Sequence, residues 1–332
     1  MSTRPMLAVN VFSYAPPPYP WILAHLDEPR LQWRNFYMHA GDDPSVPSGL
    51  AACAAAVWAV RSHRGDAVLI THGPEATRRC ALLCRMSLFR PRHIAFSFHF
   101  AQPPSRRTLA AQWACDHMVD QYVTYSALEA DVSSRRFRIR RSKIEHTHWP
   151  YEPDDIVDDT PLAERTYACA VGGSGRDYRT LIEAAALVPD IRLVLVARPQ
   201  NVAGLKLSDN VELRTLIPKD EAWSLLAHCR LSVLPLLDSR SHCGHSCLVQ
   251  AMHYGVPVVA TRSEGLHGYV TDGETARLSP CGDVQALARC MRELWDDPQG
   301  ATRLGAAGRA HARAELSPER AAAWTARLLL GG

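Results

Sequence analysis

Residues 243–261, with the sequence CGHSCLVQAMHYGVPVVAT, decide the fold of the second half of this 332-residue chain. The pattern of apolar residues predicts a helix over residues 246–254 and a buried strand over residues 256–260. Gly244 and its small neighbours form the turn before the helix. A turn, a helix and a strand thus follow one another directly, which is the repeating unit of a helix-covered parallel sheet.

The turn before this helix has the chemistry of an anion site. A glycine-containing turn at a helix N-terminus exposes unpaired backbone N–H groups and the positive end of the helix dipole. Such a site suits a diphosphate. Ser246 adds a hydroxyl donor, and Gln250 lies one turn further along the same face, where its amide can meet ribose hydroxyls. The alternative interpretation is an ordinary capped helix with Gln250 on its surface.

The alternation of strand and helix extends over the whole chain. Strands are predicted over residues 6–12, 66–71, 93–98, 121–125, 167–171, 191–197, 211–216 and 231–236. Helices in the second half are predicted over residues 177–188, 221–229, 284–295, 301–314 and 318–330. Two successive arrays of this kind predict an α/β protein with two Rossmann-like, doubly wound domains and a cleft between them. Ligands of such sheets bind outside the carboxyl ends of the strands.

An acidic, Pro-containing stretch divides the two arrays. Residues 151–160 (YEPDDIVDDT) have neither helical nor strand periodicity, which is typical of a linker. We therefore expect an N-terminal domain over residues 1–155 and a C-terminal domain over residues 156–332. The last helix, about residues 318–330, is expected to pack back on the N-terminal domain.

Charge is divided unevenly between the two halves. The chain has 37 Lys and Arg against 34 Asp and Glu, a net charge of +3, and 47% hydrophobic residues, which excludes disorder and a heavily cationic nucleic-acid binder. The first 150 residues have a net charge of +7 and the remainder −4. Residues 135–143 (RRFRIRRSK) carry six of the positive charges. They form either a solvated turn or a contact with anionic lipid headgroups or an anionic acceptor.

The sequence predicts a cytoplasmic protein without a bound metal. No segment reaches the ~20 apolar residues that span a bilayer, and the N-terminus lacks the layout of a signal peptide. The ten cysteines are scattered and form no Cys-x-x-Cys pair, which indicates reduced residues rather than a disulfide framework. His242, Cys243, His245 and Cys247 lie close together, but no second ligand pair with matching spacing completes a zinc site.

Two further turns follow predicted strands in the second half. Residues 171–177 (VGGSGRD) combine small residues, which let a backbone approach a ligand closely, with Arg176, whose planar donors suit phosphate. Residues 264–274 contain Gly265, whose neighbouring amides are placed to line the same phosphate site. Asp272-Gly273 in that segment is predicted to form a tight turn.

These motifs together resemble the donor-nucleotide domain of glycosyltransferase family 4, a group of GT-B fold enzymes. The similarity is most specific over residues 250–261 (QAMHYGVPVVAT), and it continues through residues 269–275 and 280–283. Residues 172–178 (GGSGRDY) also resemble members of this superfamily. In the first half only residues 97–100 (SFHF) resemble a family segment, the one beside the donor sugar.

The resemblance implies a hexosyltransferase-type enzyme. Such an enzyme moves a sugar from a nucleotide diphosphosugar to an acceptor hydroxyl in the synthesis of bacterial-type glycans and polysaccharides, with retention of the anomeric bond and without a metal. The nucleotide sugar is the co-substrate, and no other cofactor is implied. The acceptor is a glycan, a lipid-linked molecule or a small molecule, no nucleic acid is implied, and the basic first half is available for peripheral contact with the inner face of the membrane.

The motifs and the resemblance together assign residues to the donor diphosphate and nucleotide: Gly172, Gly173, Ser174, Arg176, Arg198, Gly244, His245, Ser246, Gln250 and Gly265. The family carries Glu-x7-Glu where this chain has His242 and Gln250. Gln250 can bind ribose through its amide oxygen. His242 cannot replace a carboxylate, so His245 or Asp238 takes the catalytic role or the site is altered.

His99 is the remaining residue with an implied catalytic role, as a contact to the sugar or acceptor; the alternative is a strand-end histidine packed among phenylalanines. Two other functions stay open. A non-catalytic GT-B partner or sugar-binding protein is favoured by His242 and Gln250. A sugar-nucleotide epimerase of the same architecture needs carboxylates in the cleft, of which Glu75 is one.

Overall fold

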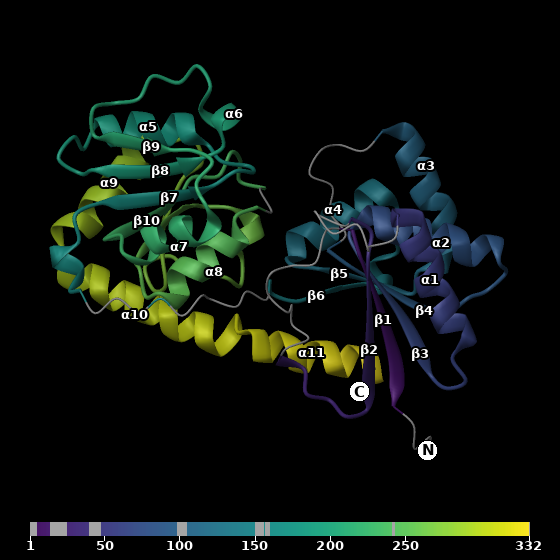
Figure 1. Cartoon of the computed structure of the whole chain (residues 1–332). Coiled ribbons are helices and arrows are strands. Elements are labelled where there is room, and N and C mark those ends of the chain that lie inside the picture. The colour runs from purple at the N-terminus through teal and green to yellow at the C-terminus, as the bar shows by residue number, and fades with distance from the viewer. Residues whose placement is uncertain are drawn as a thin grey trace. The chain divides into compact units, whose positions relative to one another are not determined.

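A computed structural model of the chain describes residues 5–13, 25–39, 48–97, 105–149, 156, 160–240 and 243–331. The chain divides into two compact units: unit 1 is Met1–Thr147 with Ala321–Gly332, and unit 2 is His148–Arg320. Each unit is built on its own six-stranded parallel sheet flanked by helices (Figure 1). The predicted α/β fold with two doubly wound domains is therefore confirmed. The acidic linker predicts the division after residue 155, whereas the structure places it at Thr147.

The sheet of unit 1 has the strand order β2-β1-β3-β4-β5-β6. Its strands are β1 (Met6–Phe12), β2 (Leu31–Tyr37), β3 (Ala67–His72), β4 (Arg92–Phe96), β5 (Gln121–Thr124) and β6 (Ile144–His146). The sequence analysis does not predict β2. This strand lies at the sheet edge, and its exposed Gln32, Arg34 and Asn35 interrupt the apolar run expected of a strand covered on both faces.

Helices cover both faces of this sheet. They are α1 (Gly49–Ser62), α2 (Pro74–Met86), α3 (Arg106–Cys115), α4 (Ala127–Phe137) and, from the end of the chain, α11 (Pro318–Leu330). Val9 and its same-face neighbours pack with the buried residues of α1 and α2. Ala8 points to the opposite face, where the cluster includes Ala322 and Leu329 of α11. The last helix therefore completes the core of unit 1, although the preceding elements belong to unit 2 (Figure 1).

The sheet of unit 2 has the strand order β12-β11-β10-β7-β8-β9. Its strands are β7 (Ala168–Gly172), β8 (Leu193–Ala197), β9 (Val211–Arg214), β10 (Leu231–Leu234), β11 (Val258–Thr261) and β12 (Arg277–Ser279). Its helices are α5 (Tyr178–Ala186), α6 (Pro199–Val202), α7 (Lys219–Ala227), α8 (His245–His253), α9 (Val284–Asp296) and α10 (Pro298–Glu315). Residues of α5 and α9 fill the core on one face, and residues of α7, α8 and α10 fill it on the other.

The strand order of unit 2 reverses between β7 and β10. The chain passes from β7 outward to β8 and β9, and then returns to place β10 on the other side of β7. The loops that leave the carboxyl ends of these two neighbours run to helices on opposite faces. Such a reversal leaves a gap between the loops, which is where ligands bind in open α/β sheets.

Glycines set both ends of α8, the helix of the opening stretch. Gly244 precedes the helix with a φ of +96°, and Gly255 follows it with a φ of +73°. Val256 N–H then donates to the Ala251 carbonyl at 3.0 Å, which satisfies a carbonyl of the last turn. The helix and strand predicted here are confirmed, each with a shift of one or two residues. None of the helices in the described part of the chain is long and apolar enough to cross a membrane.

Candidate functional site

The glycine-rich turn after β7 is held in place from both sides. Gly172 has a φ of +148° and Gly175 a φ of +64°, conformations that favour glycine. The buried Tyr178 hydroxyl donates to the Gly172 carbonyl at 2.5 Å, and burial raises the pKa of this phenol, so it remains a donor. Leu237 N–H, in the loop after β10, donates to the Gly175 carbonyl at 3.1 Å. The loops of β7 and β10 are therefore tied together at the topological reversal.

Arg176 carries a buried positive charge at this point. Only 7% of the residue is exposed. Its Nη1 donates to the Ser174 carbonyl at 2.7 Å, and its Nη2 lies 3.5 Å from the Cys247 sulfur. In the described part of the chain, its Nε has no hydrogen-bond partner and no carboxylate forms an ion pair with Arg176. A buried guanidinium without a counter-charge among the described residues is chemically suited to an anion.

Close backbone approach explains why glycines precede Arg176. A Cβ atom at residue 172 would lie 2.5 Å from Arg176 Nη2. A Cβ atom at residue 173 would lie 2.5 Å from the Nε of Arg198, which follows β8. Two arginines therefore lie against the two adjacent glycines, one buried and one exposed. The structure brings together Gly172, Gly173, Arg176 and Arg198, as the sequence analysis predicts, while Ser174 is exposed.

The N-terminus of α8 faces the same turn. Gly244 supplies no side-chain cap, so no side chain occupies the first-turn N–H groups. Cys247, in that first turn, makes the contact with Arg176, and Ser246 is partly exposed. The helix dipole and the guanidinium therefore place two positive features side by side. Cys247 is a residue that the sequence analysis does not assign to the phosphate site.

His245 has structural partners in place of a free imidazole. Its ring stacks on Tyr269 with 4.4 Å between centroids, and its Nε2 lies 2.8 Å from the Gly265 carbonyl oxygen. The residue is 6% exposed. The Gly265 N–H is itself bonded to Ser263 Oγ at 3.3 Å. The structure therefore uses His245 and Gly265 to join α8 to the loop after β11.

Gln250 is fully buried, which corrects its predicted placement. None of its surface is exposed, and its Nε2 donates to the Tyr254 hydroxyl. Within the described residues, its Oε1 has no hydrogen-bond partner. Gln250 lies between Val249 and Ala251, which are both buried in the apolar cluster of α8 and β11, and its side chain is buried with theirs. A contact to ribose would require this side chain to leave the interior.

The remaining predicted catalytic residues are less constrained. Asp238 is exposed in the loop after β10, where its Oδ1 accepts from Arg240 N–H at 2.8 Å. Glu75, the carboxylate of the epimerase hypothesis, lies in α2 and pairs with Arg79 at 2.5 Å. His99 and His242 lie outside the described residues. Among the residues that are described, no three His, Cys, Asp or Glu side chains gather as metal ligands.

Unit 1 has a polar carboxyl edge of its own. Ser97 follows β4 with a φ of +52°, a strained conformation for this residue type, and its hydroxyl lies 3.1 Å from the Tyr125 hydroxyl. Glu129 lies in the first turn of α4, and its Oε2 accepts from Tyr125 N–H at 2.7 Å. Burial raises the pKa of Glu129 to about 7. A tyrosine, a serine and a carboxyl group with a raised pKa thus lie at the edge where a ligand of this sheet is expected.

Comparison with known proteins agrees with this geometry. Residues 169–297 match the family model "Glycosyl transferases group 1". The MMP alpha-(1->4)-mannosyltransferase of Mycolicibacterium hassiacum is 36% identical over 126 residues, which are 37% of this chain and 30% of that protein. The GDP-mannose-dependent monoacylated alpha-(1-6)-phosphatidylinositol monomannoside mannosyltransferase of Corynebacterium glutamicum is 29% identical over 178 residues, 49% of this chain and 45% of that protein. The matched segments thus span less than half of the length of either relative.

The similarity to solved structures extends over both units. Anabaena HepE (Alr3699) in complex with UDP-glucose has a TM-score of 0.72 at 14% identity, over 97% of this chain and 99% of that chain. The sucrose-phosphate synthase of Thermosynechococcus elongatus has a TM-score of 0.69 at 19% identity, over 98% of both chains. At these identities the likeness shows the fold. The chain therefore has the two-domain GT-B fold, and its residues 169–297 are similar to the group 1 glycosyltransferases.

Proposed function

We propose that this protein transfers a sugar from a nucleotide diphosphosugar to an acceptor hydroxyl, with retention of the anomeric configuration and without a metal ion. The observation that carries the proposal is Arg176, a buried guanidinium with no carboxylate partner among the described residues, beside the uncapped end of α8. These groups lie at the strand-order reversal of unit 2. A diphosphate fits the place because it supplies the missing negative charge.

The same groups suit the chemistry of transfer. When the bond between the anomeric carbon and the phosphate oxygen breaks, negative charge develops on the leaving diphosphate. Fixed positive groups stabilise that charge in a site that excludes water. Arg176 is held by Ser174 and Cys247, so this cation has a defined position before the donor binds. Arg198 lies beside Gly173 and adds a second positive charge. This preorganisation supports electrostatic stabilisation by the protein itself.

The donor class is defined by the diphosphate that all nucleotide diphosphosugars share. The names of similar proteins include a GDP-mannose-dependent enzyme and a complex with UDP-glucose, which differ in base and in sugar. The groups assembled around Arg176 recognise the part that these donors have in common. We propose unit 1 as the acceptor side, with Ser97, Tyr125 and Glu129 at its polar edge. The acceptor is a glycan, a lipid-linked molecule or a small molecule of polysaccharide biosynthesis, reached in the cytoplasm or at the inner membrane surface through the basic unit 1.

A non-catalytic sugar-nucleotide-binding protein is the second candidate. It is favoured by the burial of Gln250 and by the packing of His245 on Tyr269, which remove two groups from the predicted site. Donor binding is common to both functions. Only measured transfer separates them.

The test begins with nucleotide binding. UDP, GDP and ADP are added to the purified chain and to Arg176→Ala, with Arg179→Ala as the matched control, because Arg179 is an exposed arginine of α5 that has no ion pair among the described residues. Loss of a buried charge-assisted contact of about 2–3 kcal/mol predicts a roughly 30- to 150-fold weaker affinity for Arg176→Ala alone. Unchanged affinity in Arg176→Ala, or no binding of any nucleoside diphosphate, contradicts the proposal.

Transfer is then measured with the nucleotide sugars that bind. Release of nucleoside diphosphate that depends on an added acceptor supports the transferase, and binding without release supports the non-catalytic function. Activity that survives a chelator supports metal independence. The coupling constant of the new anomeric proton reports retention or inversion.

A further inference from the structure

The basic segment of unit 1 borders a pocket that the donor site does not use. The pocket has a volume of about 360 Å³ and lies between α3 and α4. We call its lining the α3–α4 patch, which consists of Leu109, Ala110, Trp113, Arg136, Phe137 and Arg138. It combines a mainly apolar wall from α3 with two arginines from the end of α4.

The wall from α3 exposes a large aromatic side chain. Trp113 is 67% exposed and Ala110 is also exposed, whereas Gln112 and Cys115 on the other side of the helix are buried. An exposed tryptophan beside charged groups is typical of residues that sit at the boundary between headgroups and acyl chains.

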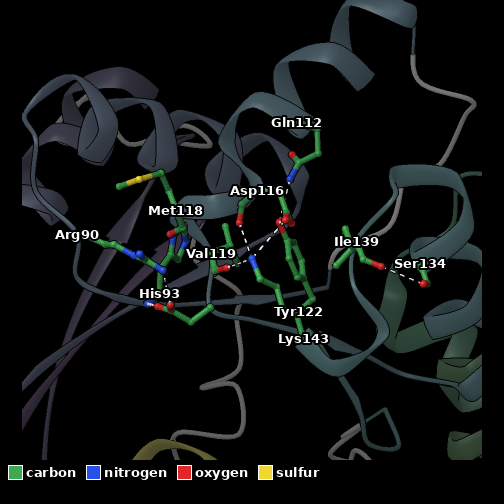
Figure 2. Close-up of polar contacts among 11 residues, drawn as sticks. Arg90, His93, Gln112, Asp116, Met118, Val119, Tyr122, Ser134, Ile139 and Lys143 are labelled. Carbon is green, nitrogen blue, oxygen red and sulfur yellow. Dashed lines mark hydrogen bonds and ion pairs between the residues drawn. The ribbon is translucent and has the colours of Figure 1, made fainter.

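Two of the six cations in residues 135–143 have partners within the unit. Lys143 donates from Nζ to the carbonyl oxygens of Asp116 and Val119 at 2.9 and 2.8 Å and pairs with the Asp116 carboxylate at 3.3 Å (Figure 2). Arg141 donates to the Ile144 carbonyl at 2.6 Å and lies 4.0 Å from Asp131. These contacts fix the C-terminal end of residues 135–143 and do not involve the four arginines that precede Arg141.

The other four cations point outward. Arg135, Arg136, Arg138 and Arg140 are exposed, while Phe137 and Ile139 between them are 7% and 2% exposed. Arg135 lies 3.9 Å from Asp131. The described residues offer no carboxylate within ion-pair distance of Arg136, Arg138 or Arg140. Alternation of buried apolar residues with unpaired arginines thus presents a row of positive charge beside Trp113.

The backbone holds Arg138 in a conformation that an arginine disfavours. Its φ is +56° at the C-terminal end of α4, where glycine is the common residue. Ser134 Oγ donates to the Ile139 carbonyl at 2.9 Å and fixes the turn around it (Figure 2). Strained backbone conformations cluster at binding sites, so the exposed side chain of Arg138 is a candidate contact for a ligand.

We propose that the α3–α4 patch docks the protein on a bilayer that contains anionic phospholipids. Headgroup phosphates bind between Arg136 and Arg138, and Trp113 enters the interface beside them. The apolar wall favours lipid over nucleic acid, because an extended backbone of phosphates needs a longer track of cations than this pocket borders. The docking surface rests on one part of the proposed function, the contact of unit 1 with the inner membrane surface, and specifies which residues make that contact. It does not depend on the nucleotide site of unit 2.

Vesicle sedimentation tests the proposal. The full chain is mixed with phosphatidylcholine vesicles with and without about 30% phosphatidylglycerol, at about 0.05 M and 0.5 M salt. We expect binding only to the anionic vesicles and a marked loss at high salt. Equal binding to both kinds of vesicle, or none, overturns the proposal. Binding of a single-stranded oligonucleotide in place of vesicles overturns it in favour of nucleic acid.

Matched variants locate the surface. Removing two cations in Arg136→Ala/Arg138→Gly is expected to weaken vesicle binding about twenty-five-fold, from about five-fold per arginine near an anionic surface. Trp113→Ala is expected to weaken it as well. Arg289→Ala/Arg303→Ala is the control, since it removes two exposed arginines from α9 and α10 of unit 2. Equal binding by the two double variants overturns the assignment to the patch.

Two readouts keep the result interpretable. Glycine suits the φ of residue 138, so Arg138→Gly is expected to keep the thermal stability of the chain, and lost vesicle binding then reports lost contacts. Nucleoside diphosphate affinity is measured on the same preparations. A double variant that binds nucleotide normally but not vesicles supports the docking surface. Vesicle binding by a chain that binds no nucleotide leaves the patch standing and refutes the donor site instead.

Discussion

Replacing Gly305 by alanine is expected to destabilise the protein, although the substitution lies in the middle of a helix. Gly305 belongs to α10 and packs against the turn between α8 and β11. A methyl group at residue 305 would lie 2.2 Å from the Gly255 carbonyl oxygen and 3.2 Å from the backbone nitrogen of Pro257. Both atoms belong to the backbone. They cannot rotate away as a side chain can.

Two opposing effects decide the magnitude. Alanine is favoured over glycine in a helix interior by about 1 kcal/mol, because glycine loses more backbone entropy on folding. Relief of the 2.2 Å contact requires α10 to move by roughly 1 Å, and overpacking of this kind costs about 1–3 kcal/mol or more. The turn resists the movement, since Val256 N–H is bonded to Ala251 and the Pro257 carbonyl accepts from Ser232 N–H at 3.0 Å. Because backbone atoms oppose the movement, we take the upper end of this cost, about 3 kcal/mol, and expect a net loss of about 2 kcal/mol.

Urea denaturation followed by circular dichroism measures the effect. Gly305→Ala should have a lower denaturation midpoint than the natural chain. Ala310→Gly, on the exposed face of the same helix, is the control, and it should lose about 1 kcal/mol from helix propensity alone. If Gly305→Ala is as stable as the natural chain or more stable, propensity dominates and the close contact of α10 with the turn is refuted.

Three further predictions concern titration and buried charge. Burial raises the pKa of Glu129 from 4.5 to about 7, so the folded state keeps a proton that the unfolded state releases, and stability falls as pH rises from about 4.5 to 7. Glu129→Gln should therefore be more stable than the natural chain by up to about 3 kcal/mol at pH 8 and equally stable near pH 4. Urea denaturation at each pH measures the difference. Burial lowers the pKa of His72 from 6.5 to about 3, so the opposite sign holds and stability is lost as pH falls below 6.5; the acid-unfolding midpoint of His72→Asn should lie at lower pH, and an unchanged midpoint would count against a buried neutral imidazole. Arg176→Met removes a buried guanidinium whose Nε has no partner among the described residues, so the melting temperature of the variant without nucleotide should be unchanged or higher. The stabilisation by added nucleoside diphosphate should disappear. A lower melting temperature without nucleotide would show that Arg176 is a structural residue.

The strand pattern was predictable because its signal is local. Residues 193–197 are all apolar, and residues 6–12 are apolar except for Asn10. Both strands lie inside a sheet that is covered on two faces. β2 was not predicted, because it is an edge strand whose polar residues interrupt the apolar run. The turn at Asp272-Gly273 was also predictable, and Gly273 adopts a φ of +78° there.

The arginines of the donor site were predictable from chain position, but their surroundings were not. Arg176 and Arg198 follow strands, and residues at the carboxyl ends of neighbouring strands meet at one edge. Helical spacing alone put Gln250 beside Ser246. The packing of α8 against β11 decides which side of the helix is buried, and it takes Gln250 inside.

The sequence by itself determined the two α/β arrays, the glycine-rich turns and the uneven charge, because apolar periodicity, glycine conformation and residue counts act over a few neighbouring residues. Only the tertiary structure decided which polar groups are free. His245 stacks on a tyrosine that follows it by 24 positions, and Lys143 binds the distant Asp116, while Arg176 and Arg138 have no carboxylate among the described residues. A group is available to a ligand when the fold brings it no partner, and partners come from residues far apart in the chain.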